Sequence, residues 1–370
     1  MNDVFIVGAG FSGIMCAINL KRLNSKLDVT IIEKDNRIGR KILQTGNGRC
    51  NIANINLDSK FYNNDYVRLV FDKYNLDYLI KYLNSIGIIL DIEEDRYYPS
   101  SFSAKSLLEI LKININKYQI KIIYNEEVVD IKNKEIITKN NKRYKSNFIV
   151  ISSGSLINKE LFNNINQPLT KLYPSLTGFI VEKKLNDIKG VRIKGLVTLL
   201  RDNKEIKNEY GEIQIKEDGF SGICVMNLSS YYQENDYLKI DLFPQYNLFE
   251  LELFLKENKV KEYKFFNIYT YNLANYLFNK YQNKSEKELS FIFKNFIFKI
   301  KGLYDNYQVI KGGINLNYIS NFESKINKDI FFTGEVLDIN GLCGGYNLMW
   351  ALGSSLYVSN FIVEKIKNMI

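Results

Sequence analysis

The hydrophobic pattern of the first 33 residues predicts a strand, a helix and a second strand. Residues 4–7 (VFIV) form a short apolar run, which is typical of a parallel strand buried on both faces. Residues 12–23 have the apolar spacing of a helix, and a second apolar run ends in the sequence TIIE at residues 30–33. This order predicts a βαβ unit at the start of an α/β fold.

The pattern changes twice along the rest of the chain. Helical spacing is expected over residues 65–88 and 103–118, a strand, turn and strand over 119–133, and a strand over 148–154. Short strands at 177–184, 191–202, 204–210 and 212–217 then predict a small antiparallel sheet or barrel. Residues 247–301 are helical and aromatic, a stripe more typical of a core than of a cofactor site. A strand and turn at 328–339 and a long apolar helix opened by 341–347 complete the pattern.

Glycines follow the first predicted strand at the spacing of a dinucleotide-binding turn. Gly8 would make the tight turn, Gly10 would let the backbone approach a pyrophosphate, and Gly13 would let the helix pack on the sheet. Glu33 follows twenty positions after the last glycine and would accept hydrogen bonds from a ribose hydroxyl. The predicted contacts of this block are Gly8, Ala9, Gly10, Ser12, Gly13 and Glu33.

A basic loop at residues 34–51 (KDNRIGRKILQTGNGRCN) favours FAD over a nicotinamide cofactor alone. A nicotinamide enzyme would normally continue into another helix, whereas here positive charge and glycines follow the acidic residue. An ordinary solvated basic loop is the alternative. The predicted contacts are Lys34, Arg40, Lys41, Gly46, Asn47, Gly48, Arg49, Cys50 and Asn51.

Distinctive blocks spread over nearly the whole chain occur at residues 8–13, 33–34, 39–51, 96–99, 219–229, 311–314 and 333–351. Together these blocks resemble the BaiN/RdsA-like (YhiN-like) bacterial family of NAD(P)/FAD-dependent oxidoreductases, which includes aminoacetone oxidase. It implies a Rossmann-like FAD-binding domain of the two-dinucleotide-binding flavoprotein type, with one tightly bound FAD and an inserted substrate domain. The expected limits are 1–155 and 308–370 for the FAD domain and 156–307 for the insert, β-rich over 170–244 and helical over 245–307.

The C-terminal block agrees with this resemblance. Glu335 and Asp338 follow a predicted strand, where carboxylates can accept hydrogen bonds from ribityl hydroxyls. The glycines before the last helix would place amides and a positive dipole near the N1/O2 edge of the flavin, although a glycine-rich start that serves packing alone is the alternative. Further predicted contacts are Val128, Ser153, Gly154, Gly334, Gly344, Gly345, Tyr346 and Asn347. The stretch after Gly154 is shorter than the corresponding stretch of the family and lacks its glycines. The substrate contacts that the family makes there are therefore in doubt for this chain.

Composition excludes several classes of chemistry. The 370-residue chain has no histidine, which removes Ser-His-Asp and Cys-His hydrolysis. Its four cysteines include no C-x-x-C pair, so no metal site and no paired-thiol redox centre is predicted. The net charge of +9 comes from scattered lysines, so no nucleic-acid partner is expected. With neither a signal segment nor a membrane span apparent, we expect a soluble, cytoplasmic protein.

The sequence therefore predicts an FAD-dependent oxidoreductase that transfers a hydride between flavin N5 and a small organic substrate. NADH or NADPH would act as a transient reductant, and the reaction would be reduction of a conjugated double bond or oxidation of an amine or ketone. Tyr346 is the expected proton donor, with Tyr98, Cys343 or water as alternatives. The alternative functions are a flavin-dependent RNA-modifying enzyme and a non-catalytic flavin-binding module. The sequence predicts neither the substrate nor the oligomeric state.

Overall fold

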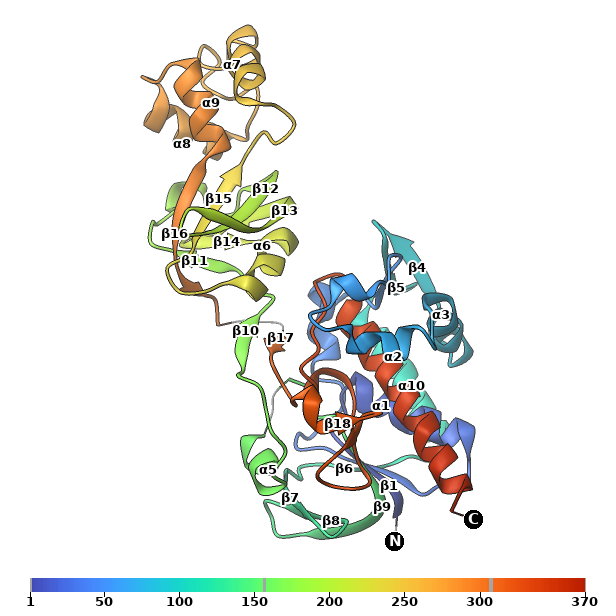
Figure 1. Cartoon of the computed structure of the whole chain (residues 1–370). Coiled ribbons are helices and arrows are strands. Elements are labelled where there is room, and N and C mark those ends of the chain that lie inside the picture. The colour runs from blue at the N-terminus through green and yellow to red at the C-terminus, as the bar shows by residue number, and fades with distance from the viewer. Residues whose placement is uncertain (1, 156–157, 306–308, 370) are drawn as a thin grey trace. The chain divides into compact units, whose positions relative to one another are not determined.

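The computed structural model describes residues 2–155, 158–305 and 309–369 (Figure 1). The chain forms two compact units: unit 1 comprises Met1–Tyr173 and Ile310–Ile370, and unit 2 comprises Pro174–Val309. Strands β10 (Tyr173–Ser175) and β17 (Val309–Lys311), where the chain leaves and re-enters unit 1, pair with each other. Unit 2 is therefore an insertion into unit 1. The predicted limits of the insert, residues 156 and 307, lie outside the described residues and stay a prediction.

A parallel sheet forms the centre of unit 1. Val4 pairs with Val29 on one side of β1 and with Phe148 on the other, and the strand order is β20-β9-β1-β2-β6. Val4 and Ile6 have no exposed surface, as expected for a strand covered on both faces. The five strands are β1 (Asn2–Val7), β2 (Val29–Ile32), β6 (Lys121–Ile123), β9 (Arg143–Ile151) and β20 (Ile330–Phe332).

Antiparallel strands extend this sheet, and a second small sheet lies in the same unit. Strands β18 (Ile319–Ser320) and β19 (Glu323–Ser324) continue from β20, while β7 (Val128–Lys132) and β8 (Glu135–Thr138) pair on from β9. The second sheet has the order β3-β5-β4, with β3 at Ala53–Asn54, β4 at Leu90–Glu93 and β5 at Arg96–Pro99.

Two long helices from opposite ends of the chain pack side by side in unit 1 (Figure 1). Helix α1 (Phe11–Leu23) confirms the predicted helix at 12–23, and α10 (Tyr346–Lys367) confirms the long C-terminal helix. Nearly all of α1 is buried, and α10 buries Trp350 and the small residues Ser354 and Ser355. Small side chains allow the two helix backbones to approach closely.

Shorter helices complete unit 1. The helix expected over 65–88 is interrupted: α2 (Arg68–Phe71) ends, and α3 (Leu76–Ser85) begins where the Asn75 side chain accepts from the Tyr78 amide. An asparagine that caps a helix favours a new start over continuation of the old helix. The remaining helices are α4 (Ala104–Lys117), which confirms the prediction at 103–118, and α5 (Lys159–Asn164).

Unit 2 contains a closed antiparallel barrel with the order β11-β14-β13-β12-β15-β16, as the strand pattern predicted. The predicted strands at 204–210 and 212–217 are one continuous strand, β13. Gly211 does not break it, because Gly211 pairs with Gly195 of β12 and lies close to Cys224. The strands are β11 (Phe179–Val181), β12 (Arg192–Arg201), β13 (Lys204–Ile215), β14 (Gly219–Ser221), β15 (Tyr237–Asp241) and β16 (Phe296–Leu303).

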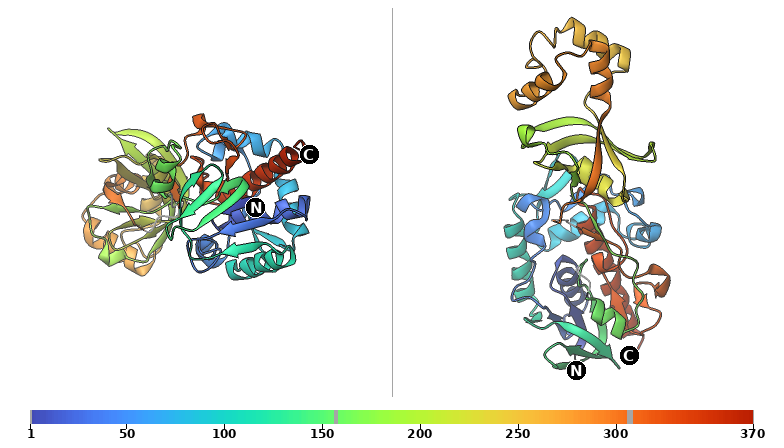
Figure 2. Two further views of the ribbon diagram at one scale, coloured as in Figure 1. Left: turned by 90° about the horizontal axis from the view of Figure 1, so that it is seen from below. Right: turned by 90° about the vertical axis from the view of Figure 1, so that its left-hand side faces the viewer.

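The helical part of unit 2 lies between β15 and β16 in the chain and at one end of the barrel (Figures 1 and 2). The helical pattern expected through residue 301 ends at Lys294, because residues 296–303 alternate between buried and exposed positions and form β16. This part comprises α7 (Leu248–Glu257), α8 (Tyr271–Tyr281) and α9 (Glu286–Lys294), whereas α6 (Ile223–Leu228) precedes β15. Unit 2 has a hydrophobic core separate from that of unit 1.

Candidate functional site

The turn between β1 and α1 requires glycine at two positions. Gly8 has a φ of +105°, and a Cβ atom there would lie 2.7 Å from the carbonyl oxygen of Ser152. A Cβ atom on Gly13 would lie 2.0 Å from the carbonyl oxygen of Gly8. These two glycines therefore allow the strand and the helix to meet at close range, as the sequence predicted.

Gly10 has a different environment, because its neighbourhood is open. A Cβ atom there would meet no atom within 4 Å. Helix α1 begins without a side-chain cap and has no acidic residue in its first turn, whereas Asn75 and Ser103 cap α3 and α4 in the same unit. Helix α1 thus presents uncapped amides and the positive end of its dipole at an open turn, which suits an anionic group.

The carboxylate of Glu33 is fixed at the carboxyl end of β2. The Ala9 amide donates to Oε2 at 2.6 Å, and the Asp35 amide donates to Oε1 at 2.9 Å. Each carboxylate oxygen can accept more than one hydrogen bond, so both remain able to accept from a hydroxyl group. Lys34, the next residue, is exposed.

Residues from three distant segments meet at Lys41. Its ammonium donates to the Ser155 hydroxyl at 2.7 Å and to Glu335 Oε2 at 2.9 Å, and Gly154 lies beside the same carboxylate. The predicted contacts Lys41, Gly154 and Glu335 are therefore neighbours. Ser155 was missed by the sequence analysis, although it directly follows Gly154.

Buried hydroxyl groups tie this region to α10. Ser12 Oγ donates to Thr333 Oγ1 at 2.8 Å and lies 2.9 Å from Ser355 Oγ, while Ser152 Oγ lies 2.6 Å from Thr333 Oγ1. The Ser12 side chain is thus engaged within the protein. A Cβ atom on Gly334 would lie 2.9 Å from the Ser12 side chain, so this glycine permits the contact.

Two predicted contacts carry buried polar atoms that have no hydrogen-bond partner among the described residues. These atoms are Asn51 Oδ1 and Ser153 Oγ. A buried polar atom without a partner is costly, which points to a bound polar group. Cys50 beside Asn51 is fully buried with a φ of 60°, and burial raises the pKa of its thiol to about 11, so it is not a ready thiolate.

The residues of the basic loop have different surroundings along its length. Arg40 lies 3.6 Å from Asp35, and together with Asn36 and Arg37 they line an open pocket of about 380 Å³. Gly46 and Gly48 both have positive φ values, as predicted for backbone that turns toward a ligand. The side chain of Asn47 lies outside the part of the chain that the structure describes.

Arg49 has partners that the sequence analysis did not foresee. Its guanidinium forms two hydrogen bonds with Glu93, at 3.0 and 2.6 Å, and lies over the rings of Tyr98 and Phe102 at 4.6 and 4.8 Å. These bonds raise the pKa of Arg49 and lower that of Glu93. The structure thus gives Arg49 a role in holding the loop to the hairpin of β4 and β5.

The start of α10 is shaped by glycines. Gly345 has a φ of +95°, and a Cβ atom there would lie 2.5 Å from the backbone of Ala53; Gly344 also has a positive φ and lies near Asn54. Asn347 closes the preceding loop, because its side chain accepts from the Gly341 amide and donates to the Gly341 carbonyl. Helix α10, like α1, has no side-chain cap.

Tyr346 is the first residue of α10 and is 5% exposed. Its ring lies 4.9 Å from that of Phe61 and 5.8 Å from that of Tyr62, whose hydroxyl donates to the Tyr346 carbonyl. Burial raises the pKa of Tyr346 to about 12, and burial also raises the pKa of Tyr62 well above its ordinary value. Tyr346 is therefore a neutral hydrogen-bond donor at ordinary pH.

Two further predicted contacts, Asp338 and Val128, are hydrogen-bonded to other segments of unit 1. The Asp338 amide donates to the Ile314 carbonyl, and its side chain accepts from Asn63. Val128 begins β7, and its carbonyl accepts from Asn158 at 3.1 Å. The cofactor contacts of all these residues remain predictions.

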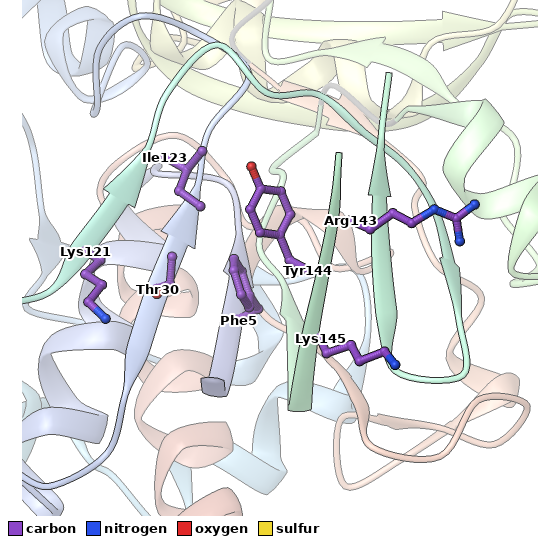
Figure 3. Close-up of a pocket in the computed structure, with 7 residues that line it drawn as sticks. All are labelled: Phe5, Thr30, Lys121, Ile123, Arg143, Tyr144 and Lys145. Carbon is purple, nitrogen blue, oxygen red and sulfur yellow. The ribbon is translucent and has the colours of Figure 1, made fainter. Parts of the chain in front are cut away.

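A second pocket of about 380 Å³ contains none of the predicted residues. It lies over the sheet and is lined by Phe5, Thr30, Lys121, Ile123, Arg143, Tyr144 and Lys145. Figure 3 shows Lys121 on one side of the Phe5 and Tyr144 rings and Arg143 and Lys145 on the other, so their charges do not converge. Among the described residues, no three His, Cys, Asp or Glu side chains are placed to hold a metal, and no helix could cross a membrane.

Comparison with known proteins identifies relatives along the full length. The chain is 26% identical to the 3-dehydro-bile acid delta(4,6)-reductase of Clostridium scindens, over 99% of this chain and 100% of the relative. It is 25% identical to the ribosomal RNA dihydrouridine synthase of Haemophilus influenzae, over 96% of each chain, and 23% identical to that of Escherichia coli, over 95% and 96%.

Similarity to a solved structure supports the fold. The chain is similar to the FrdA subunit of E. coli quinol fumarate reductase with a TM-score of 0.51 and 15% identity, covering 98% of this chain and 70% of that one. The fold is thus the Rossmann-type FAD-binding α/β fold with an inserted antiparallel barrel, as predicted. Residues 2–360 match the model of the HI0933-like protein Rossmann domain, and the chain therefore belongs to the HI0933-like family, in agreement with the BaiN/RdsA-like resemblance.

Proposed function

We propose that this protein is an FAD-dependent reductase that acts on a carbon–carbon double bond conjugated with a carbonyl group. The names of the relatives describe one kind of chemistry on two different substrates. A delta(4,6)-reductase of a 3-dehydro-bile acid and a dihydrouridine synthase both saturate a double bond that is conjugated with a carbonyl. Such a bond accepts hydride at its electron-poor carbon. Reduction therefore fits the relatives better than oxidation of an amine or ketone.

The buried polar atoms Asn51 Oδ1 and Ser153 Oγ carry the proposal that FAD is the cofactor. Asn51 is the last residue of the basic loop, and Ser153 lies beside the β1–α1 turn. Neither atom has a partner among the described residues. The open approach at Gly10 adds a place for negatively charged phosphates. These features fit a polar, extended ligand with a pyrophosphate.

Each part of the site would hold a different part of FAD. The β1–α1 turn would bind the pyrophosphate, Glu33 the adenosine ribose, and the Val128 backbone the adenine. Glu335 and Asp338 would accept from ribityl hydroxyls, and the uncapped start of α10 would face the flavin ring. When bound, FAD supplies hydride transfer at N5. NADH or NADPH would serve as the reductant.

Tyr346 would supply the proton that saturation of the double bond requires. Its ring is held by Phe61 and Tyr62, and its hydroxyl remains protonated because burial raises its pKa to about 12. A weak acid can still act as a donor when it is hydrogen-bonded to the group whose basicity rises during the reaction. Tyr98, Cys343 and water are the remaining donors that the sequence offers.

The decisive experiment is anaerobic stopped-flow spectroscopy of the FAD-reconstituted protein. The flavin is first reduced with NADH or NADPH and then mixed with an α,β-unsaturated ketone or with its saturated counterpart. We expect the unsaturated ketone alone to reoxidise the flavin. Failure to bind FAD would overturn the cofactor assignment, and turnover of amines with oxygen but not of the enone would overturn the reductase assignment. Turnover of any acceptor would exclude a non-catalytic flavin-binding module.

A second candidate is the same reduction performed on a uridine of ribosomal RNA. Two of the relatives are ribosomal RNA dihydrouridine synthases, and the net charge of +9 would favour a polyanionic substrate. The test compares unmodified ribosomal RNA with the small enone in the same reoxidation assay. An RNA substrate predicts faster reoxidation by RNA and a steep loss of RNA binding as salt rises. RNA without effect on the reduced flavin would exclude this candidate.

A further inference from the structure

Two lysines of unit 2 converge on one phenol oxygen. Lys183, which follows β11, donates from Nζ to the Tyr276 hydroxyl oxygen at 3.0 Å, and Lys280 on α8 donates to the same oxygen at 3.5 Å. Tyr276 and Lys280 are one helical turn apart, which places both on the same face of α8. Two positive charges therefore share one neutral acceptor.

No carboxylate neutralises this pair among the residues that the structure describes. The nearby carboxylates are already engaged: Glu182, next to Lys183 in sequence, pairs with Lys299 at 3.0 Å. Asp218, whose carbonyl accepts from the Val181 amide, lies 3.8 Å from Lys184. Neither Lys183 nor Lys280 forms an ion pair within the described chain. Like charges held together without a counter-charge repel each other, so this arrangement favours an external anion.

The hydroxyl of Tyr276 adds a third donor. Its oxygen accepts from both ammonium groups, so its own hydrogen is left to donate, and no acceptor for that hydrogen is found among the described residues. Two ammonium groups and one hydroxyl thus offer donors around one point. Three aromatic rings also lie near the Lys280 ammonium, at 5.5 Å for Tyr276, 4.9 Å for Tyr281 and 5.8 Å for Phe296.

Electrostatics agree with this geometry. Burial and then the nearby Lys183 lower the pKa of Lys280 to about 8. An anion bound between the two lysines would remove the repulsion and raise that pKa again. A rise in the pKa of Lys280 would therefore indicate that an anion is bound.

We propose that Lys183, Tyr276 and Lys280 form a phosphate-binding site on unit 2, separate from the FAD site. A phosphate group matches the site because several oxygens and one or two negative charges can meet three donors at once. The phosphate could belong to a small phosphorylated molecule or to the backbone of RNA. This inference does not rest on the proposed reaction, because it involves no flavin chemistry.

The first test is calorimetric titration of the full chain with inorganic phosphate in a zwitterionic buffer. We expect Lys183→Gln and Lys280→Gln each to weaken phosphate binding about ten-fold, because each removes a charge-assisted hydrogen bond. Lys287→Gln is the matched control: Lys287 is an exposed lysine on α9 without an ion pair within the described chain, and its replacement should leave binding unchanged.

The second test uses the unaltered protein, so it does not depend on the folding of variants. Each lysine is acetylated by a limiting amount of an amine-reactive ester at pH near 8, and its labelling is measured by peptide mass spectrometry. Phosphate should protect Lys280 but not Lys287. A short oligoribonucleotide that also protects Lys280 would identify a phosphodiester source, and protection by phosphate alone would identify a small phosphorylated ligand. If phosphate neither binds nor protects Lys280, the proposal is wrong.

Discussion

At the scale of single residues, we predict opposite effects for the replacement of two adjacent serines. Ser152 Oγ lies 2.6 Å from Thr333 Oγ1, whereas the buried Ser153 Oγ has no partner among the described residues. We expect Ser153→Ala to leave the FAD-free protein as stable as before and to weaken FAD binding about ten-fold, since a hydroxyl that serves only the ligand costs nothing to remove without it.

Ser152→Ala is the matched control for this prediction. It removes a buried hydrogen bond, so it should lower the free energy of unfolding of the FAD-free protein by about 1 kcal/mol. Urea unfolding measures the stability of both variants, and quenching of flavin fluorescence measures FAD affinity. If Ser153→Ala destabilised the FAD-free protein as much as Ser152→Ala, the hydroxyl would have a structural role instead.

The pKa of Tyr346 predicts how the rate of substrate reduction depends on pH. Because burial raises its pKa from 10.0 to about 12, the donor form is fully present below pH 10 and is lost only as the pH rises through the raised value. The rate of substrate reduction should therefore show no loss due to Tyr346 between about pH 6 and pH 10.

Replacement of Tyr346 tests the same role directly. Tyr346→Phe keeps the ring packed beside Phe61 and Tyr62 and removes only the hydroxyl, so we expect about a 100-fold slower substrate reduction. Reduction of the flavin by NADH or NADPH should be unaffected, because that step needs no proton from Tyr346. An unchanged rate of substrate reduction would transfer the donor role to Tyr98, Cys343 or water.

At the scale of elements, the start of α10 depends on a glycine that no other residue can replace. Gly345 combines a positive φ with a close approach to Ala53 at 2.5 Å, whereas Gly87 has a φ of +89° and its nearest neighbour, Ile110, lies at an ordinary 3.8 Å. Gly87→Ala should lower the free energy of unfolding by only the conformational penalty of about 1 kcal/mol. Gly345→Ala should lower the free energy of unfolding by clearly more, because it displaces the helix start from β3. For the same reason it should lower the FAD content of the purified protein. Equal costs in urea unfolding would contradict this.

Elements formed by local pattern were predicted well. The strand, turn and helix at residues 4–23 and the final helix each carry their own signal, namely an apolar run, glycines at fixed spacing and a long apolar stretch. The interruption at Asn75 was missed, because an asparagine within helical spacing can either face solvent or start a new helix. Gly211 was taken as a break between strands, because the sequence does not show that Gly195 and Cys224 lie next to it.

The candidate site was predictable only in part for the same physical reason. Glycines that serve a turn are recognisable from spacing, and so Gly8, Gly13 and Gly345 were anticipated. Partners of charged side chains are set by contacts between distant segments, and neither the Arg49–Glu93 pair nor the Lys41–Glu335 pair follows from local pattern. Two of the positive charges in the basic loop therefore have protein partners that the sequence does not reveal.

At the scale of the whole molecule, the two units have separate hydrophobic cores, and all predicted FAD contacts belong to unit 1. A ligand stabilises only the unit that binds it, so differential scanning calorimetry should resolve two transitions of which one responds to FAD. At an FAD concentration 100 times its dissociation constant, binding adds about 2.7 kcal/mol, which for a unit of this size raises the transition by about 5 to 10 °C.

Core variants can assign these two transitions without reference to FAD. Phe331 and Phe293 are both fully buried, the first in the sheet of unit 1 and the second in α9 of unit 2. Each change to alanine should lower the free energy of unfolding by about 3 to 5 kcal/mol, because buried area is lost and a cavity is left behind. Phe331→Ala should lower the FAD-responsive transition, and Phe293→Ala should lower the other. A single transition that both variants and FAD shift together would mean that the cores unfold as one cooperative unit, and FAD would then stabilise the phosphate site of unit 2 as well.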